Sequence, residues 1–216
     1  MILHFGILIL AGILLPVLLY FESTENRKGL VPAKTSLSML FVLTALIQAH
    51  PHPAYYHFLL LGLLFCLGGD VCLTSPKMFL MGLVAFLVGH VFYIIAFFHL
   101  SCFNTWTWIG AALFFMVSGC IYLWLSPHLG PMKGPVGAYV GVISVMAVGA
   151  FTIMGDPRLP LTARGMVFSG ALAFYASDIF VARDRFIKKE TLNRFLGLPL
   201  YYGGQFFLAF SVSHVG

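Results

Sequence analysis

Two aspartates, Asp70 and Asp178, lie inside long apolar segments of this chain. An ionised Asp near the centre of a bilayer costs roughly 2.5–3.5 kcal/mol, against a total stability of about 5–15 kcal/mol for a typical protein. Ionisable residues at such positions are therefore typical of functional sites, and a structural hydrogen bond between helices is the alternative. If the two carboxyl groups share a site, one can stay protonated while the other is ionised, which supplies a general acid and a general base.

The two aspartates are predicted to lie at one depth. Each is placed about four residues before the end of its apolar segment, and at about 1.5 Å per residue this is about 6 Å below the membrane interface. Their segments, the third and the seventh, run in the same direction if every segment crosses the membrane. We therefore predict that Asp70 and Asp178 form a catalytic pair.

Other polar side chains fall near the same layer, and we predict that they bind substrate. They are Lys34 at the start of the second apolar segment, Ser177 beside Asp178, His90 and Tyr93 in the fourth segment, and Tyr201, Tyr202 and Gln205 in the last. Simpler roles stay open for each of them. Tyrosines anchor helices at membrane interfaces, a lysine can snorkel, and a membrane histidine often bonds a neighbouring helix.

Three histidines, His50, His52 and His57, cluster at the opposite end of the predicted helices from the aspartates. Three histidines can hold zinc, but this short loop is far from the predicted pair, so we expect no metal site. The chain has no HExxH motif, no phosphate-binding glycine loop and no Gly-x-Ser-x-Gly elbow. The four cysteines are expected to pack as small apolar residues. No metal or cofactor is predicted.

The composition explains what must position these residues. The 216 residues are 60% hydrophobic and only 9% charged, with a mean hydropathy of +0.97. A soluble domain carries about 25% charged residues, so lipid must be the main solvent of this chain. The apolar segments are continuous rather than alternating, which favours helices over a membrane barrel. We predict an all-α bundle of eight transmembrane helices at about 3–21, 34–50, 55–74, 79–99, 105–125, 135–154, 163–182 and 197–214.

The charges predict an orientation for this bundle, which we expect to be a single domain over residues 1–216. Only Arg158 and Arg164 fall on one side of it, and the other ten of the twelve Lys and Arg residues fall on the other: Arg27, Lys28, Lys34, Lys77, Lys133, Arg183, Arg185, Lys188, Lys189 and Arg194. Such asymmetry places the basic loops in the cytoplasm. Both termini are then outside the inner membrane, and the net charge of +5 reflects orientation rather than nucleic-acid binding. The N-terminus lacks a basic signal-peptide region, so we expect the first helix to be retained.

The basic stretch from Arg183 to Arg194 either only orients the protein or also contacts anionic lipid headgroups.

The chain also contains a weak internal echo. Gly62 precedes Asp70 by eight residues and Gly170 precedes Asp178 by eight, at an offset of 108 residues. Either this echo is chance, or two four-helix halves are parallel repeats with a site at their interface.

Three stretches of the chain together resemble the YhhN-like lysoplasmalogenase family of membrane proteins. They are Gly69-Asp70-Val71 with Gly82 to His90, then Gly170 through Asp178 to Phe186, and Leu198-Pro199-Leu200-Tyr201-Tyr202 with Gln205. The similarity extends from about residue 55 to the end and is looser before that. The family tends to carry a Lys-Pro pair in the second helix, whereas Pro32 precedes Lys34 here.

The resemblance implies a hydrolase of lipid metabolism that cleaves the vinyl-ether bond of lysoplasmalogens. The substrate is then a lysophospholipid from the surrounding membrane, and the products are a fatty aldehyde and a glycerophospho-ethanolamine or -choline. The resemblance also implies that Asp70 and Asp178 are essential. Glycosidases use two carboxyl groups for a similar oxocarbenium problem, so no metal and no obligate protein partner is expected.

Two other functions fit the same residues. Membrane carboxylates relay protons in transporters, which predicts a proton-coupled carrier. Histidines could instead serve a metal-dependent membrane lipid amidase. A purely structural role is the third alternative.

Overall fold

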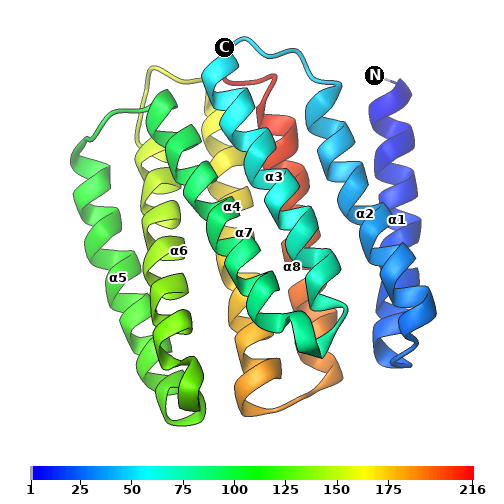
Figure 1. Cartoon of the computed structure of the whole chain (residues 1–216). Coiled ribbons are helices and arrows are strands. Elements are labelled where there is room, and N and C mark those ends of the chain that lie inside the picture. Colours follow the sequence, from blue (N-terminus) through cyan, green and yellow to red (C-terminus); the bar gives the residue numbers. More distant parts are fainter. Residues whose placement is uncertain (1) are drawn as a thin grey trace.

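The structure, a computed structural model, describes residues 2–216 and forms a bundle in which successive helices run in opposite directions (Figure 1). In this range there are eight long helices and no strand. The all-α membrane bundle predicted from the sequence is thus confirmed. The helices are α1 (Ile2–Ser23), α2 (Arg27–Leu46), α3 (Pro53–Leu73), α4 (Phe79–Leu100), α5 (Thr105–Leu125), α6 (Lys133–Met154), α7 (Leu161–Ala182) and α8 (Thr191–Ser211).

The connections at the two ends of the bundle differ. Both termini lie at one end, which we call the terminal end (Figure 1). The opposite, basic end carries the connections α1–α2, α3–α4, α5–α6 and α7–α8. It also holds four short helices: the 3₁₀ turns η1 (Pro76–Met78), η2 (Ser126–His128) and η3 (Gly130–Met132), and the π-helix η4 (Arg183–Ile187).

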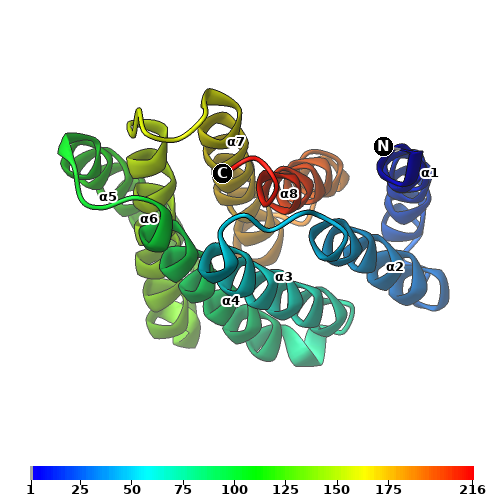
Figure 2. The same ribbon diagram turned by 90° about the horizontal axis from the view of Figure 1, so that it is seen from above.

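Seven of the helices, α1 to α7, are long and apolar enough to cross a membrane. Helix α8 has a similar length but is not among these seven, and it lies among α1, α2, α3 and α7 (Figure 2). Its neighbours shield it, so it can carry polar residues such as Tyr201 and Gln205 at membrane depth.

Helix α2 differs from the prediction at both ends. It begins at Arg27 instead of about residue 34, and the Asn26 side chain caps it by accepting from the backbone N–H of Gly29 at 3.4 Å. Its first turns, with Pro32, extend beyond the apolar segment. It ends at Leu46 instead of about residue 50, ahead of Pro51 and Pro53. Helix α8 likewise begins at Thr191 instead of about 197, so hydropathy alone predicts only the central part of both helices.

Glycines bring two helix pairs into close contact. A Cβ on Gly62 of α3 would lie 3.1 Å from the carbonyl oxygen of Gly89 in α4, and a Cβ on Gly170 of α7 would lie 2.9 Å from that of Gly204 in α8. Small residues at such positions let the backbones of membrane helices approach each other. Since Gly62 and Gly170 each precede an aspartate by eight residues, the α3–α4 and α7–α8 pairs are packed in the same way at the two places where the sequence echo occurs.

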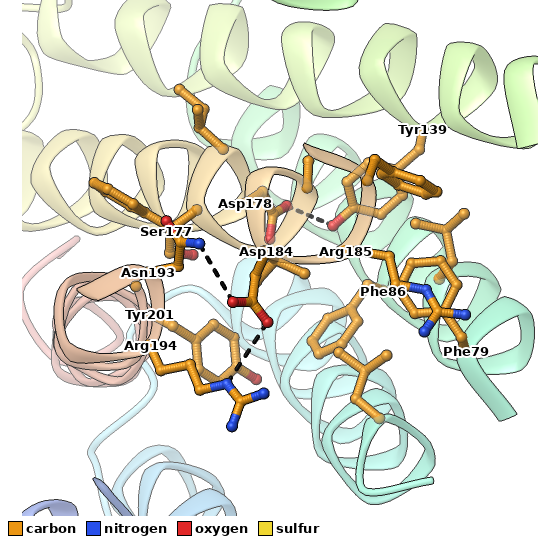
Figure 3. Close-up of a pocket in the computed structure, with 18 of the residues that line it drawn as sticks. Phe79, Phe86, Tyr139, Ser177, Asp178, Asp184, Arg185, Asn193, Arg194 and Tyr201 are labelled. Atoms are coloured by element: carbon orange, nitrogen blue, oxygen red, sulfur yellow. Dashed lines mark hydrogen bonds and ion pairs between the residues drawn. The ribbon is translucent and has the colours of Figure 1, made fainter. Parts of the chain in front are cut away.

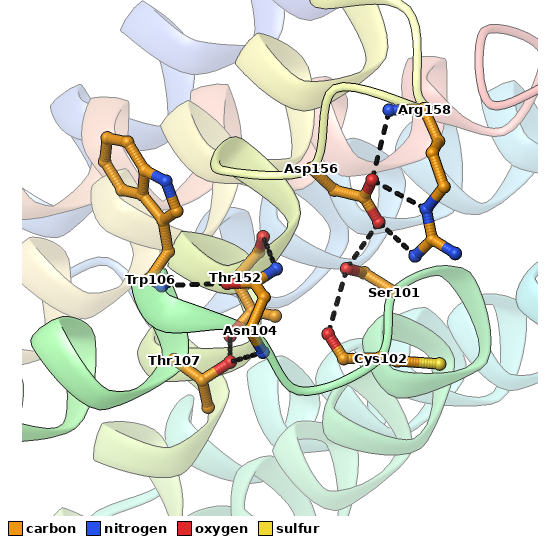
Figure 4. Close-up of polar contacts among 8 residues, drawn as sticks. All are labelled: Ser101, Cys102, Asn104, Trp106, Thr107, Thr152, Asp156 and Arg158. Carbon is orange, nitrogen blue, oxygen red and sulfur yellow. Dashed lines mark hydrogen bonds and ion pairs between the residues drawn. The ribbon is translucent and has the colours of Figure 1, made fainter.

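A polar network ties two loops together at the terminal end (Figure 4). Asp156 accepts hydrogen bonds from Ser101 Oγ at 2.8 Å and from the Arg158 guanidinium at 2.9 and 2.6 Å. These bonds from Arg158 hold the pKa of Asp156 well below its usual range. Nearby, Asn104 Nδ2 donates to the carbonyl oxygen of Thr152 at 3.2 Å. The network therefore fixes the α4–α5 connection against the α6–α7 connection.

Candidate active site

A cavity of about 540 Å³ lies in the basic half of the bundle. It extends from the level of Asp70 and Asp178 to the connections at the basic end, and Figure 3 shows part of its wall. This volume is typical of pockets that hold a small organic ligand. Both aspartates predicted to act together thus line one cavity, although they come from the distant helices α3 and α7.

Asp70, in the last turn of α3, is surrounded by groups that suit a carboxylate. Its Oδ2 accepts hydrogen bonds from Ser38 Oγ and from the Tyr201 hydroxyl, each at 2.6 Å. Its Oδ1 lies 3.6 Å from Lys34 Nζ, and the two side chains are only 3% and 7% exposed. Lys34 and Ser38 lie one turn apart on the same face of α2, so one helix supplies both the counter-charge and a donor.

Asp178, in the last turns of α7, has a sparser environment. Its Oδ2 accepts a hydrogen bond of 2.5 Å from the Tyr139 hydroxyl of α6 (Figure 3). Within residues 2–216 it forms no salt bridge. The two carboxyl groups therefore differ: Asp70 has a cation and two donors, whereas Asp178 has one donor.

Three of the predicted substrate-binding residues, Lys34, Ser177 and Tyr201, line the cavity. Of these, Lys34 and Tyr201 also contact Asp70. The hydroxyl of Ser177 donates to the carbonyl oxygen of Phe174 in its own helix at 2.7 Å. Ser177 is therefore placed beside Asp178 without bonding it.

Three other predicted residues, Tyr93, Tyr202 and Gln205, do not line this cavity but lie behind its wall. The Tyr202 hydroxyl is 3.4 Å from Ser38 Oγ, so it touches the site through that serine. The Tyr93 hydroxyl donates to Gln205 Oε1 at 2.7 Å, deeper in the bundle. Their geometry is that of residues that support the site from outside.

His90 also lies outside the cavity wall and is fully buried. Its ring packs on Phe174, with centroids 4.6 Å apart, and edge-on against Tyr139 at 5.3 Å. Neither ring nitrogen has a hydrogen-bond partner among the described residues. His90 thus contacts the tyrosine that bonds Asp178 from behind the cavity wall, and its role in substrate binding stays a prediction.

Two residues of the site, Ser38 and Tyr139, were not predicted. Ser38 could have been found, because it lies one turn after Lys34 and so shares its face. Tyr139 is one of nine tyrosines, and nothing in its local sequence indicates that it reaches Asp178.

Within residues 2–216, no group of three or more His, Cys, Asp or Glu side chains is placed to hold a metal ion. At the terminal end, His50 stacks on the ring of Tyr56, with centroids 4.1 Å apart. The histidine cluster noted in the sequence therefore packs partly on an aromatic side chain.

The fold and the cavity define a polytopic helical membrane protein that holds two carboxyl groups near one end of its bundle. The model of the YhhN family matches residues 31–212. The chain belongs to this family, in agreement with the resemblance found in its sequence.

Three curated relatives carry the name lysoplasmalogenase. TMEM86B of Rattus norvegicus is 29% identical over 194 residues, which cover 87% of this chain and 75% of the relative. TMEM86A of Bos taurus is 30% identical, covering 80% and 74%, and TMEM86A of Homo sapiens is 33% identical, covering 76% and 68%. No solved structure matches the chain significantly.

Proposed function

We propose that this protein hydrolyses the vinyl-ether bond of lysoplasmalogens, with Asp70 and Asp178 as its catalytic pair. The observation that carries the proposal is one cavity that holds two carboxyl groups in unequal environments. The names of the relatives support the substrate class and favour an ether-lipid hydrolase over the proton-coupled carrier and the metal-dependent amidase.

The reaction needs one acid, one base and one water. The acid protonates the alkene carbon remote from the ether oxygen, which leaves an oxocarbenium ion. Water adds to the cationic carbon as the base takes its proton, and the product is a hemiacetal. The bond between the hemiacetal carbon and the glycerol oxygen then breaks. The glycerol oxygen takes the proton that the base had accepted from water, the hemiacetal hydroxyl returns a proton to the acid, and a fatty aldehyde is released.

The environments of the two aspartates support a division of roles. Lys34 and the two hydroxyl donors stabilise Asp70 as a carboxylate, which suits the base that stabilises the cation and activates water. Asp178 has a single donor, which occupies only one of its oxygens. We therefore assign Asp178 the role of the general acid, which holds the proton at the start of the reaction.

The cavity suits a lysolipid that enters from the basic end. Its inner wall is apolar and is formed by side chains of α4, α5 and α6: Leu83, Phe86, Ile121, Leu125, Val136, Val140 and Ile143. Its mouth is formed by charged side chains of the α7–α8 connection. A hydrocarbon chain against the apolar wall and a headgroup at the mouth would place the vinyl ether near the aspartates.

The charge distribution supports an orientation with the basic end in the cytoplasm and both termini outside the inner membrane. The substrate would then be taken from the inner leaflet.

Isotope labelling tests the proposed reaction. Purified protein is incubated with 1-alkenyl lysophosphoethanolamine, and the masses of the products are measured by mass spectrometry. In D₂O the aldehyde should gain one deuterium at its α-carbon, and in H₂¹⁸O the released glycerophosphoethanolamine should stay unlabelled. The saturated 1-alkyl analogue should be inert, because it has no alkene to protonate. Cleavage of that analogue, or ¹⁸O in the glycerol product, would refute the proposal.

A further inference from the structure

The mouth of the cavity holds four cations, and three of them are paired with carboxylates. Lys188 bonds Glu190, Lys189 bonds Glu25, and Arg194 bonds both Glu22 at 3.1 Å and Asp184 at 3.6 Å. The fourth, Arg185, forms no salt bridge within residues 2–216. Of these four charges, only that of Arg185 is not already balanced by an acidic side chain.

An aromatic ring positions Arg185. Its guanidinium carbon lies 4.5 Å from the centroid of the Phe79 ring, at the start of α4 (Figure 3). Such stacking is attractive but leaves the positive charge and the planar donors available. Arg185 is therefore held at the mouth without being neutralised.

The position of Arg185 along the chain also sets its distance from Asp178. It lies in the π-helix η4, which continues α7 directly from the turn that carries Asp178. The two residues are seven apart in the chain, which corresponds to roughly 10 Å along a helix axis. In a lysoplasmalogen, the glycerol separates the vinyl ether from the phosphate by a comparable length once a hydrogen bond is added at each end.

We propose that Arg185 binds the phosphate of the lysolipid headgroup and so selects phosphate-bearing ether lipids over neutral ones. The inference rests on the proposed function for the identity of the lipid. A guanidinium suits this task because it can give two parallel hydrogen bonds to phosphate oxygens. The paired cations of the mouth remain occupied by their own carboxylates.

Binding to lipids that cannot be hydrolysed tests this inference. The dissociation constants of 1-alkyl lysophosphoethanolamine and of 1-alkylglycerol are measured by thermophoresis for the detergent-solubilised protein. Arg185→Ala should weaken binding of the phospholipid about tenfold or more, as expected for a lost charged hydrogen bond, and leave alkylglycerol binding unchanged. Arg185→Lys should lose less, since it keeps the charge. The control is Lys77→Ala, which removes an exposed cation of the same end outside the cavity and should change neither constant.

Two results would overturn the inference. One is unchanged phospholipid binding by Arg185→Ala, or an equal loss for both lipids. The other is displacement of the lipid by an equal concentration of inorganic phosphate, which would assign the site to a free anion. No bond breaks in this assay, so it tests the contribution of Arg185 to lipid binding even if the wild-type protein releases no aldehyde. Aldehyde release with unaltered binding by Arg185→Ala would contradict the inference alone.

Discussion

Lys34 and Asp70 form an ion pair inside the bundle, with almost no exposure of either side chain. Moving two charges out of water is expensive, and their attraction offsets that cost only if further hydrogen bonds complete the site. Ser38 and Tyr201 supply those bonds to Asp70. The pair is therefore balanced as it stands and sensitive to the loss of one member.

We predict that Lys34→Met destabilises the protein by about 3–5 kcal/mol, because it leaves a buried carboxylate without its cation. Thermal unfolding in detergent measures this. Adding Asp70→Asn to that variant should recover part of the loss, since the uncompensated charge is then gone. Strictly additive losses would show that the two residues do not interact.

At the scale of single residues, the sequence predicts the site only in part. Asp70 and Asp178 are conspicuous because charges are rare in apolar segments, and the structure places both on one cavity. Tyr139 is not conspicuous, because hydroxyl side chains are common in membrane helices and its partner lies on another helix, whereas Ser38 is indicated only by its place one turn after Lys34. His90 is conspicuous in the sequence for the same reason as the two aspartates, but in the structure its ring packs against Tyr139 and Phe174 and does not line the cavity.

At the scale of elements, glycine contacts bring α8, the helix that carries Tyr201, close to α7. A Cβ on Gly204 would lie 2.7 Å from the carbonyl oxygen of Gly170, whereas a Cβ on the adjacent Gly203 would meet nothing within 4 Å.

Gly204→Ala should therefore lower the stability by about 1–3 kcal/mol, because the two backbones must separate to admit the methyl group. Gly203→Ala is the matched control and should be neutral or slightly stabilising, since alanine favours helix. The unfolding temperatures of both variants in detergent check this. Equal temperatures would show that close approach of these helices is unimportant.

The loop network at the terminal end makes a prediction about pH. Arg158 lowers the pKa of Asp156 in the folded protein, so this carboxylate stabilises the fold at neutral pH. That contribution is lost as the pH falls below the ordinary carboxyl value of about 4 and through the lowered one. Asp156→Asn should thus lower the unfolding temperature at pH 7, and the difference from wild type should shrink as the pH falls. A difference that stays constant with pH would contradict this.

Helix boundaries were predictable only where the membrane sets them. The prediction for the fifth helix, about 105–125, agrees with α5 at Thr105–Leu125. In contrast, α2 and α8 extend beyond their apolar segments at the basic end. There, helix caps and contacts between neighbouring helices decide the start, and hydropathy carries no information about either.

At the scale of the whole molecule, the chain concentrates its cations at one end of the bundle and its termini at the other. The basic end, where the cations lie, also holds the mouth of the cavity. The alternating direction of successive helices was predictable from the consecutive apolar segments, but the contacts between non-consecutive helices were not. That α8 lies close enough to α3 for Tyr201 to bond Asp70 follows from packing between distant segments.

Labelling with a membrane-impermeant maleimide tests the proposed orientation. Cys102 is exposed in the α4–α5 connection at the terminal end, so it should react in intact cells. A Ser75→Cys variant places a thiol in the α3–α4 connection at the basic end and should react only after permeabilisation. Because Cys120 is also exposed and Cys72 is partly exposed, both are replaced by serine in each protein, and the Ser75→Cys variant also carries Cys102→Ser. The reverse pattern would invert the orientation.

The central claim is that Asp70 and Asp178 act together, and one assay tests it most directly. Aldehyde release from lysoplasmalogen is measured for purified wild type, Asp70→Asn and Asp178→Asn, after each variant is shown to be folded by its unfolding transition. Each substitution should reduce turnover by about a hundredfold or more, as expected for loss of a general acid or base. Asp156→Asn, which removes an acid far from the cavity, should stay active. Wild-type turnover in either folded variant, Asp70→Asn or Asp178→Asn, would contradict the account.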